Sequence, residues 1–267
     1  MSAMSDLMGF SAMWLAKILL LSLRVGVVFT STPLLPAASV PLRVRLLLIL
    51  ALSAALSLAL PPIASLRLSF ESSALFLSVL REIALGCLLA VSVSMAFAVF
   101  SIAGRLLDIQ IGFGMGQVLD PTSNLQLPIL TTVFNHLALI IFFLLNGPNA
   151  LLRGLAYSLE HFPLGQPWSL MAASGALFPQ LAGLFALSFS LVAPVVFCVL
   201  MVEMALGVLS RNLPQMNMLA LGIPVKILVG VLALVLWFAG IGNVMSRIYW
   251  SIYRTWDNVF AVQARVN

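Results

Sequence analysis

The sequence predicts an all-α protein of the integral membrane class, and three observations lead to this prediction. Of the 267 residues, 62% are hydrophobic and 8% are charged, and the mean hydropathy is +1.15. A soluble domain has roughly 25% charged residues, so this chain lacks the polar side chains that would cover a water-facing surface. The apolar residues form long runs, several of them near the ~20 residues that a transmembrane helix needs. The runs do not alternate strictly with polar residues, which favours helices over the strands of a membrane barrel.

About six apolar segments are predicted to be helices. In chain order they are residues 10–29, 46–60, 83–103, 129–145, 181–202 and 227–245. The fourth ends at Gly147-Pro148, which is a strong helix terminator. Pro194 lies inside the fifth, and the sixth begins just after Pro224 and Lys226. Because proline breaks or kinks a helix, the segments are predicted to form kinked helical hairpins.

Several charged residues interrupt or border the apolar segments. Lys17 and Arg24 lie seven residues apart in the first segment and therefore share one helix face, while Glu203 ends the fifth and Lys226 opens the sixth. A charge at the centre of a bilayer costs at least ~2.5–3.5 kcal/mol, so it normally faces a polar partner or a watery cavity. A lysine near a segment end can instead reach the membrane interface, and the sequence leaves open which environment Arg24 has. The loops also show no usable bias of basic residues between two sides of a membrane, which indicates that the helices are not simple bilayer crossings.

The sequence contains no recognisable catalytic, metal or cofactor motif. His136 and His161 are isolated from other ligands. Cys87 and Cys198 lie in different apolar segments, where they are predicted to be buried as small hydrophobic residues. The net charge of +5 comes from scattered basic residues, which favours lipid headgroups or acidic protein surfaces over nucleic acid. We therefore predict no enzyme activity, no cofactor, no metal and no nucleic-acid partner.

A glycine-dotted segment at residues 104–128, GRLLDIQIGFGMGQVLDPTSNLQLP, separates the third and fourth apolar segments. Two interpretations of it are open. Glycine permits backbone conformations that other residues avoid, so the segment can be a compact loop. Alternatively, Gly112 and Gly116 lie four residues apart and form a surface for close helix packing.

Several stretches of the chain occur in a familiar order and spacing: REIALGCLLAV, AGRLLDIQIGFGMGQVLDPTSNLQLPIL, FFLLNGPNALLRGLAYSLEHFPLG and MALGVLSRNLPQMNMLALGIPVKILVG. They resemble the FliR family of flagellar export-gate proteins, whose relatives in virulence type III secretion form the SctT class. The resemblance covers roughly residues 20–245. Family members often have an acidic residue where Arg105 stands and a histidine where Pro148 stands, which puts in doubt any local role for these two positions. The run LGIPVKILVG resembles the flagellar members more than the virulence members.

The resemblance implies a function and a set of partners. FliR-like proteins join FliP-like and FliQ-like subunits in a closed helical assembly, and FlhA-like and FlhB-like proteins are further components of the export apparatus. The assembly is the pore through which unfolded flagellar subunits leave the cytoplasm. The implied location is the bacterial inner membrane at the flagellar basal body, with apolar helices packed against partners as well as against membrane lipid. The implied division of the chain is a FliP-like part at residues 1–170 and a FliQ-like helical hairpin at residues 171–267.

The resemblance also implies two candidate sites. The first is a plug loop that closes the pore and comprises Ile111, Gly112, Phe113, Gly114, Met115, Gly116, Gln117, Asp120 and Pro121. The second is a set of residues that contact neighbouring subunits: Arg24, Glu203, Arg211, Pro214, Gln215, Asn217, Pro224 and Lys226. The stretch RNLPQMNMLALGIPVK is predicted to form the turn of the FliQ-like hairpin.

Two alternative functions remain beside the flagellar gate. One is the corresponding subunit of a virulence secretion apparatus. The other is a conventional six-helix secondary transporter, which binds its substrate at broken helices. A transporter built from inverted repeats would show similarity between its halves, and residues 1–130 and 131–267 show none. A gate subunit would occur as one copy in a large hetero-oligomer, whereas a transporter would purify alone or as a homo-oligomer.

Overall fold

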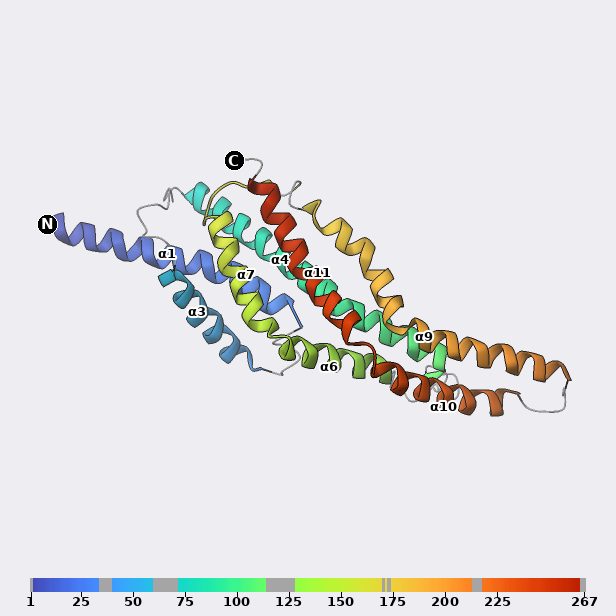
Figure 1. Ribbon diagram of the computed structural model, residues 1–267. Coiled ribbons are helices and arrows are strands. Elements are labelled where there is room, and N and C mark those ends of the chain that lie inside the picture. The colour runs from blue at the N-terminus through green and yellow to red at the C-terminus, as the bar shows by residue number, and fades with distance from the viewer. Residues whose placement is uncertain are drawn as a thin grey trace. The chain divides into compact units, whose positions relative to one another are not determined.

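The structure is a computed structural model that describes residues 2–33, 40–59, 72–113, 128–169, 171, 174–212 and 218–264. Over these residues the chain is helical and contains no strand, which confirms the all-α class (Figure 1). The helices are α1 (Ser2–Ser31), α3 (Leu42–Ala59), α4 (Ser72–Ile111), α6 (Ile129–Leu144), α7 (Gly147–His161), α9 (Leu177–Asn212), α10 (Met218–Phe238) and α11 (Gly242–Ala264).

The six predicted segments correspond to α1, α3, α4, α6, α9 and α10. Two of these helices are much longer than predicted, with 40 residues in α4 and 36 in α9, because polar residues that interrupt an apolar run still continue a helix. The helices α7 and α11 were not predicted. Each mixes apolar residues with polar and charged ones, so neither forms a continuous apolar run.

Proline and glycine have mixed effects on the helix boundaries. The terminator Gly147-Pro148 follows α6, as predicted, but it also begins α7. A proline in the first turn costs no intrahelical hydrogen bond, and Asn146 before it adopts a left-handed backbone with φ 54°, which asparagine tolerates. The prediction that the last apolar helix begins after Pro224 is wrong, because Pro224 lies inside α10. Apolar helices tolerate such a proline where neighbouring protein satisfies the freed carbonyl.

Four helices in the described part of the chain are long and apolar enough to cross a membrane, judged by length and composition. The candidate spans are Met13–Ser31 in α1, Ser73–Ile111 in α4, Leu177–Asn212 in α9 and Leu221–Phe238 in α10. The number rises to five if α6 and α7 together form one broken span. The chain is therefore an all-α membrane protein, although α3, one of the six predicted apolar helices, is not a candidate span.

The chain folds into two compact units, each assembled from separate stretches. Unit 1 comprises Met1–Met95, Asn146–Gln180 and Ile252–Asn267, and unit 2 comprises Ala96–Leu145 and Leu181–Ser251. The chain passes between the units within α4, α9 and α11, and also between α6 and α7. These units group residues by their contacts, whereas the predicted division at residue 170 concerns likeness to partner proteins, so that division stays a prediction.

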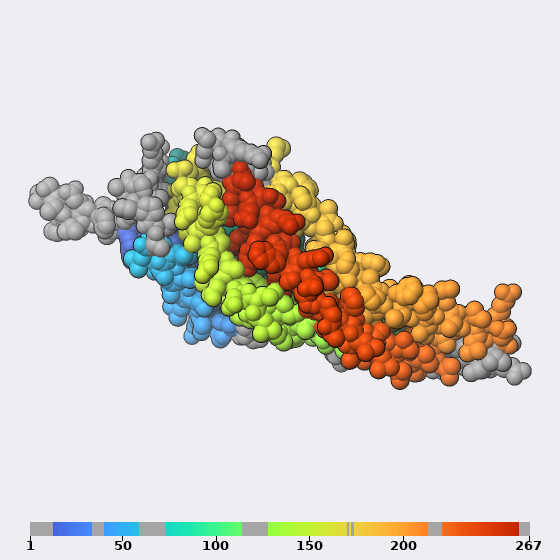
Figure 2. Space-filling model, viewed as in Figure 1, coloured from blue at the N-terminus to red at the C-terminus, as the bar shows by residue number. Residues whose placement is uncertain are grey.

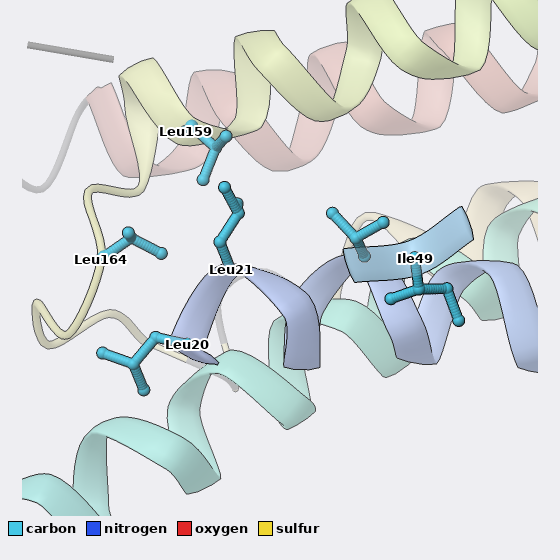
Figure 3. Close-up of a cluster of buried hydrophobic side chains, with 6 residues drawn as sticks. Leu20, Leu21, Ile49, Leu159 and Leu164 are labelled. Carbon is cyan, nitrogen blue, oxygen red and sulfur yellow. The ribbon is translucent and has the colours of Figure 1, made fainter. Parts of the chain in front are cut away.

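A hydrophobic cluster in unit 1 forms between α1, α3 and the end of α7. Its buried members are Leu20, Leu21, Val25, Ile49, Leu159 and Leu164. Figure 3 shows Leu21 of α1 pointing toward Leu159 of α7, with Leu164 on the segment that follows α7. The cluster packs α1 against α3 and α7 by excluding their apolar side chains from the surface.

The helix α7 lies beside the C-terminal part of α11 in unit 1 (Figures 1 and 2). Trp256 of α11 lies directly over Gly154 of α7, where an added Cβ atom would be 2.1 Å from the indole ring. The indole N–H of Trp256 donates to the Oγ atom of Ser92 on α4 over 2.5 Å. The rings of Tyr157 and Phe260 also stack edge to face, with centroids 5.3 Å apart. Trp256 therefore joins α4, α7 and α11.

Both cysteines are free, with Cys87 exposed and Cys198 half-buried, so the prediction that both are buried is wrong. Large side chains on α9 are exposed as well, among them Phe185, Phe189 and Phe197. Lipid tails are as apolar as such side chains, so a membrane protein can expose them to lipid or to a partner without the cost that water would impose.

Candidate functional site

The carboxylate of Asp108, in the last turn of α4, caps the first turn of α6. Its Oδ1 atom accepts a hydrogen bond from the backbone N–H of Leu130 over 2.8 Å, and its Oδ2 atom accepts one from the backbone N–H of Thr131 over 2.9 Å. The Thr131 hydroxyl donates to the same Oδ2 atom over 2.7 Å. The first N–H groups of a helix lack partners within the helix, and negative charge is favoured beside them. Because Pro128 at the N-cap of α6 provides no side-chain cap, a residue of another helix supplies it.

The helices α4 and α6 approach each other closely along the same contact. An added Cβ atom on Gly104 of α4 would lie 2.5 Å from the Cα atom of Thr131 and 2.9 Å from its nitrogen. A side chain at position 104 would therefore push the two backbones apart. Farther from the Asp108 cap, Ser101 donates its hydroxyl to Oδ1 of Asn135 over 2.6 Å. Together these contacts join the end of α4 to the beginning of α6.

The helix α4 ends at Gly112 by a backbone reversal. Gly112 has a φ of 98°, and its N–H donates to the carbonyl of Asp108 over 3.3 Å, which is the αL type of helix ending. A left-handed conformation costs a residue with a side chain about 1–2 kcal/mol. Gly112 therefore does not lie on a helical face, which argues against the interpretation that Gly112 and Gly116 form a helix-packing surface.

Ile111, the last residue of α4, is fully buried within unit 2. Its side chain packs on α10, where an added Cβ atom on Gly230 would lie 2.7 Å from the Cγ1 atom of Ile111. This position makes Ile111 part of the packing between α4 and α10, so we leave it out of the proposed seal. Phe113 is half-buried. The other predicted plug residues lie outside the described residues: Gly114, Met115, Gly116, Gln117, Asp120 and Pro121.

The helices α9 and α10 form an antiparallel hairpin in unit 2 (Figure 1). Lys226 of α10 forms an ion pair with Glu203 of α9. Farther from the turn, the indole N–H of Trp237 donates to the carbonyl of Leu191 over 2.9 Å. The two charges that border the last apolar segments are therefore partners of each other. The Glu203 side chain is still 40% exposed and that of Lys226 21% exposed, which leaves both able to contact a further group.

Two of the remaining predicted subunit contacts lie on the helices of this hairpin. Arg211 is exposed at the end of α9, and Pro224 is exposed on α10. Most of the stretch predicted to be the turn is helical, because α10 already begins at Met218. Three further residues that are predicted to contact neighbouring subunits lie outside the described residues: Pro214, Gln215 and Asn217.

Arg24 of α1 is buried in a polar cluster of unit 1. Its Nε atom donates to Oε2 of Glu82 on α4 over 2.6 Å, while Nη1 and Nη2 donate to the carbonyls of Ser158 and Phe162 over 3.2 and 2.9 Å. Glu82 also accepts a hydrogen bond from the N–H of Gly165 over 3.1 Å. A cation is favoured at a helix C-terminus, here that of α7. Because Arg24 faces protein and is satisfied within its own chain, we leave it out of the proposed subunit contacts.

Lys17, which lies seven residues before Arg24 on α1, makes a similar contact. Its Nζ atom donates to the carbonyl of Ser57, near the C-terminus of α3, over 2.9 Å. Lys17 and Arg24 are both buried, and each meets carbonyls at the end of another helix. The Lys17 ammonium therefore has a polar partner within the chain and need not extend to the membrane interface.

The cap made by Asp108 was missed from sequence, although the residue lies in the segment that was singled out. One signal could have indicated it. The residues that begin α6, Pro128 and Ile129, offer no serine, threonine, aspartate or asparagine as a local cap. The first turn of this helix therefore needed an acceptor from elsewhere. Among the described residues, no cluster of three histidine, cysteine or acidic side chains forms a candidate metal site.

Comparison with known proteins shows the family of the chain. The model of the family described as "Bacterial export proteins, family 1" matches residues 15–251. The chain is 26% identical to the flagellar biosynthetic protein FliR of Bacillus subtilis over 91% of this chain and 94% of that protein. It is 31% identical to FliR of Escherichia coli over 78% of this chain and 79% of that protein. It is 29% identical to the surface presentation of antigens protein SpaR of Shigella sonnei over 57% of this chain and 58% of that protein.

Fold and charge placement together define the class: an all-α membrane protein whose long helices carry buried charges that have polar partners within the chain. The family match covers nearly the whole chain. The chain belongs to the FliR family of bacterial export proteins. This confirms the resemblance that the sequence stretches had indicated.

Proposed function

We propose that the chain is a non-enzymatic subunit of the flagellar type III export gate in the bacterial inner membrane, at the flagellar basal body. The observation that carries this proposal is the family match over residues 15–251, together with relatives named flagellar biosynthetic protein FliR that align with most of the chain. With FliP-like and FliQ-like subunits, and beside FlhA-like and FlhB-like components, it forms the pore through which unfolded flagellar subunits leave the cytoplasm.

The hairpin of α9 and α10 is proposed as a surface for neighbouring subunits. Its apolar side chains are widely exposed, including Met204 on α9 and Leu232 on α10, and its ion pair between Glu203 and Lys226 remains open on one side. In a hetero-oligomer this surface would be covered by partner helices, with polar contacts to the pair. The proposed contacts are Glu203, Arg211, Pro214, Gln215, Asn217, Pro224 and Lys226.

The segment that begins at Gly112 is proposed as the seal of the pore. A pore wide enough for an unfolded chain would dissipate ion gradients across the membrane if it stayed open. Phe113 and Met115 would close it as apolar residues, with Gly114 and Gly116 providing the freedom to rearrange when a substrate passes. The reversal of the α4 backbone at Gly112 supports this proposal, because it directs the chain out of the helix at this residue.

Deletion of residues 114–117 tests the seal. The deletion spares Ile111 and Gly112, whose packing and helix ending would otherwise be lost with it. We expect the complex to assemble and to leak ions or a small dye, while alanine at positions 114 and 116 lowers export without leakage. The measurement pairs membrane permeability with the yield of intact complex. A deletion variant that assembles and stays tight would show that the segment is not the seal.

The virulence apparatus is the second candidate, and the match to SpaR of Shigella sonnei favours it. Complementation decides between the two. The chain is expressed in a flagellated strain that lacks its own FliR and in a virulence strain that lacks SpaR. The flagellar proposal predicts recovered motility in the first strain and no recovered secretion in the second. The reverse pattern would assign the chain to the virulence apparatus.

A further inference from the structure

The end of α4 and the beginning of α6 are joined by three kinds of contact on the same pair of helices. Asp108 accepts three hydrogen bonds from Leu130 and Thr131. Gly104 allows the two backbones to approach, and Ser101 bonds to Asn135 over 2.6 Å. These contacts join the two helix ends that flank residues 112–128, the segment proposed as the seal.

We propose that Asp108 is a positioning residue of the gate: its carboxylate makes the end of α4 and the beginning of α6 one rigid frame that stays joined while substrates pass. The inference rests on the proposed function, because it assigns the frame to the gate. It adds to that function that the contact between α4 and α6 stays intact when the pore opens.

The chemistry of the cap explains why a carboxylate is needed at position 108. Three donors converge on two carboxylate oxygens, and Asp108 is 4% exposed, so water does not replace a lost partner. Hydrogen bonds to a charged acceptor are about twice as strong as neutral ones. An asparagine would place an N–H₂ group against a backbone N–H donor, which removes at least one bond and sets two donors against each other.

A second anchor holds the same helix end to α10. Ile111 follows Asp108 by three residues and is fully buried against Gly230. The last turn of α4 is therefore fixed on two sides, by the cap on α6 and by this packing. Rearrangement of the chain beyond Gly112 then need not disturb either helix.

Substitutions at the cap test the positioning role. Asp108→Asn and Thr131→Val should assemble and leak, with the greater leak from Asp108→Asn, whereas Thr131→Ser keeps the hydroxyl and should behave like the parent protein. The double variant should leak no more than Asp108→Asn, because both changes remove the same interaction. Asp257→Asn removes a carboxylate from an exposed site on α11 and serves as the matched control.

A cross-link tests the frame independently of the cap. Cysteines replace Ser101 and Asn135 in a chain whose Cys87 and Cys198 have been changed to alanine. After oxidation, or after reaction with a short bis-methanethiosulfonate linker that forms one disulfide with each cysteine and releases methanesulfinate, we expect the locked complex to export substrates at the rate of the reduced complex. Loss of export on locking, with recovery on reduction, would overturn the inference because opening would then require α4 and α6 to separate.

The outcomes separate this inference from the proposed function. If deletion of residues 114–117 leaks while Asp108→Asn and Thr131→Val assemble and stay tight, the seal stands and the positioning role of Asp108 is wrong. If the deletion stays tight, the seal itself is wrong. If Asp108→Asn fails to assemble, Thr131→Val and the cross-link still decide the inference, since neither removes the carboxylate.

Discussion

The guanidinium of Arg24 donates to the carboxylate of Glu82 over 2.6 Å, with the two side chains 1% and 3% exposed. The contact links α1 to α4, and the remaining Arg24 nitrogens reach carbonyls at the end of α7. A charge within an apolar helix is thus neutralised by its own chain. The charges of this protein are therefore not all evidence of partners or of a substrate path.

Replacement of Arg24 by leucine should strongly destabilise the chain. Removal of one member of a buried ion pair costs about 3–5 kcal/mol, because the other charge stays buried without a partner. The measurement is the denaturation midpoint of the purified complex, with Arg254→Leu at an exposed site of α11 as the control. The double variant Arg24→Leu, Glu82→Leu should recover much of the loss. Equal midpoints for Arg24→Leu and Arg254→Leu would contradict this account.

Alanine at position 154 should destabilise the packing of α7 against α11. The new Cβ atom would lie 2.1 Å from the ring of Trp256, and overpacking of this kind typically costs 1–3 kcal/mol. Gly183→Ala is the matched control, since nothing lies within 4 Å of a Cβ atom there, and alanine should favour the helix by up to ~1 kcal/mol. Trp256→Leu should partly rescue Gly154→Ala. The measurement is the denaturation midpoint of each variant in the purified complex. Equal midpoints for Gly154→Ala and Gly183→Ala would disprove the contact with Trp256.

Leucine at position 226 should reduce assembly or export more than it reduces the stability of the chain. Partly exposed ion pairs contribute only about 0.2–1 kcal/mol to folding, so a large loss of assembly would come from contacts with neighbouring subunits. Exchange of the two charges in Glu203→Lys, Lys226→Glu should preserve the hairpin but not those contacts. Arg247→Leu, at an exposed site of α11, is the control. Wild-type motility with an intact complex in Lys226→Leu would contradict a polar subunit contact there.

The positions of the apolar helices could be predicted because long apolar runs are a local property of the sequence. The helices α7 and α11 could not be found in this way, since their polar residues break the runs even though the helices are continuous. The beginning of α10 is predicted wrongly if Pro224 is treated as a helix boundary. Proline disfavours the interior of an isolated helix, but whether its freed carbonyl is satisfied depends on neighbours that the local sequence does not identify.

The partners of charged residues required tertiary structure. That Arg24 needed a polar partner follows from its place in an apolar run, but Glu82 lies 58 positions away. Asp108 and Thr131 are 23 positions apart, and their contact depends on the close approach at Gly104. The glycine-dotted segment could be singled out from the sequence, and its role as a seal stays a prediction. The contacts that hold its two ends could not be predicted.

Mass measurement of the intact complex, purified from membranes through a tag on this chain, tests the central claim most directly. The account predicts a large hetero-oligomer that contains one copy of this chain with several FliP-like and FliQ-like subunits. A stable monomer or homo-oligomer that transports a small solute would contradict it and would favour the conventional transporter.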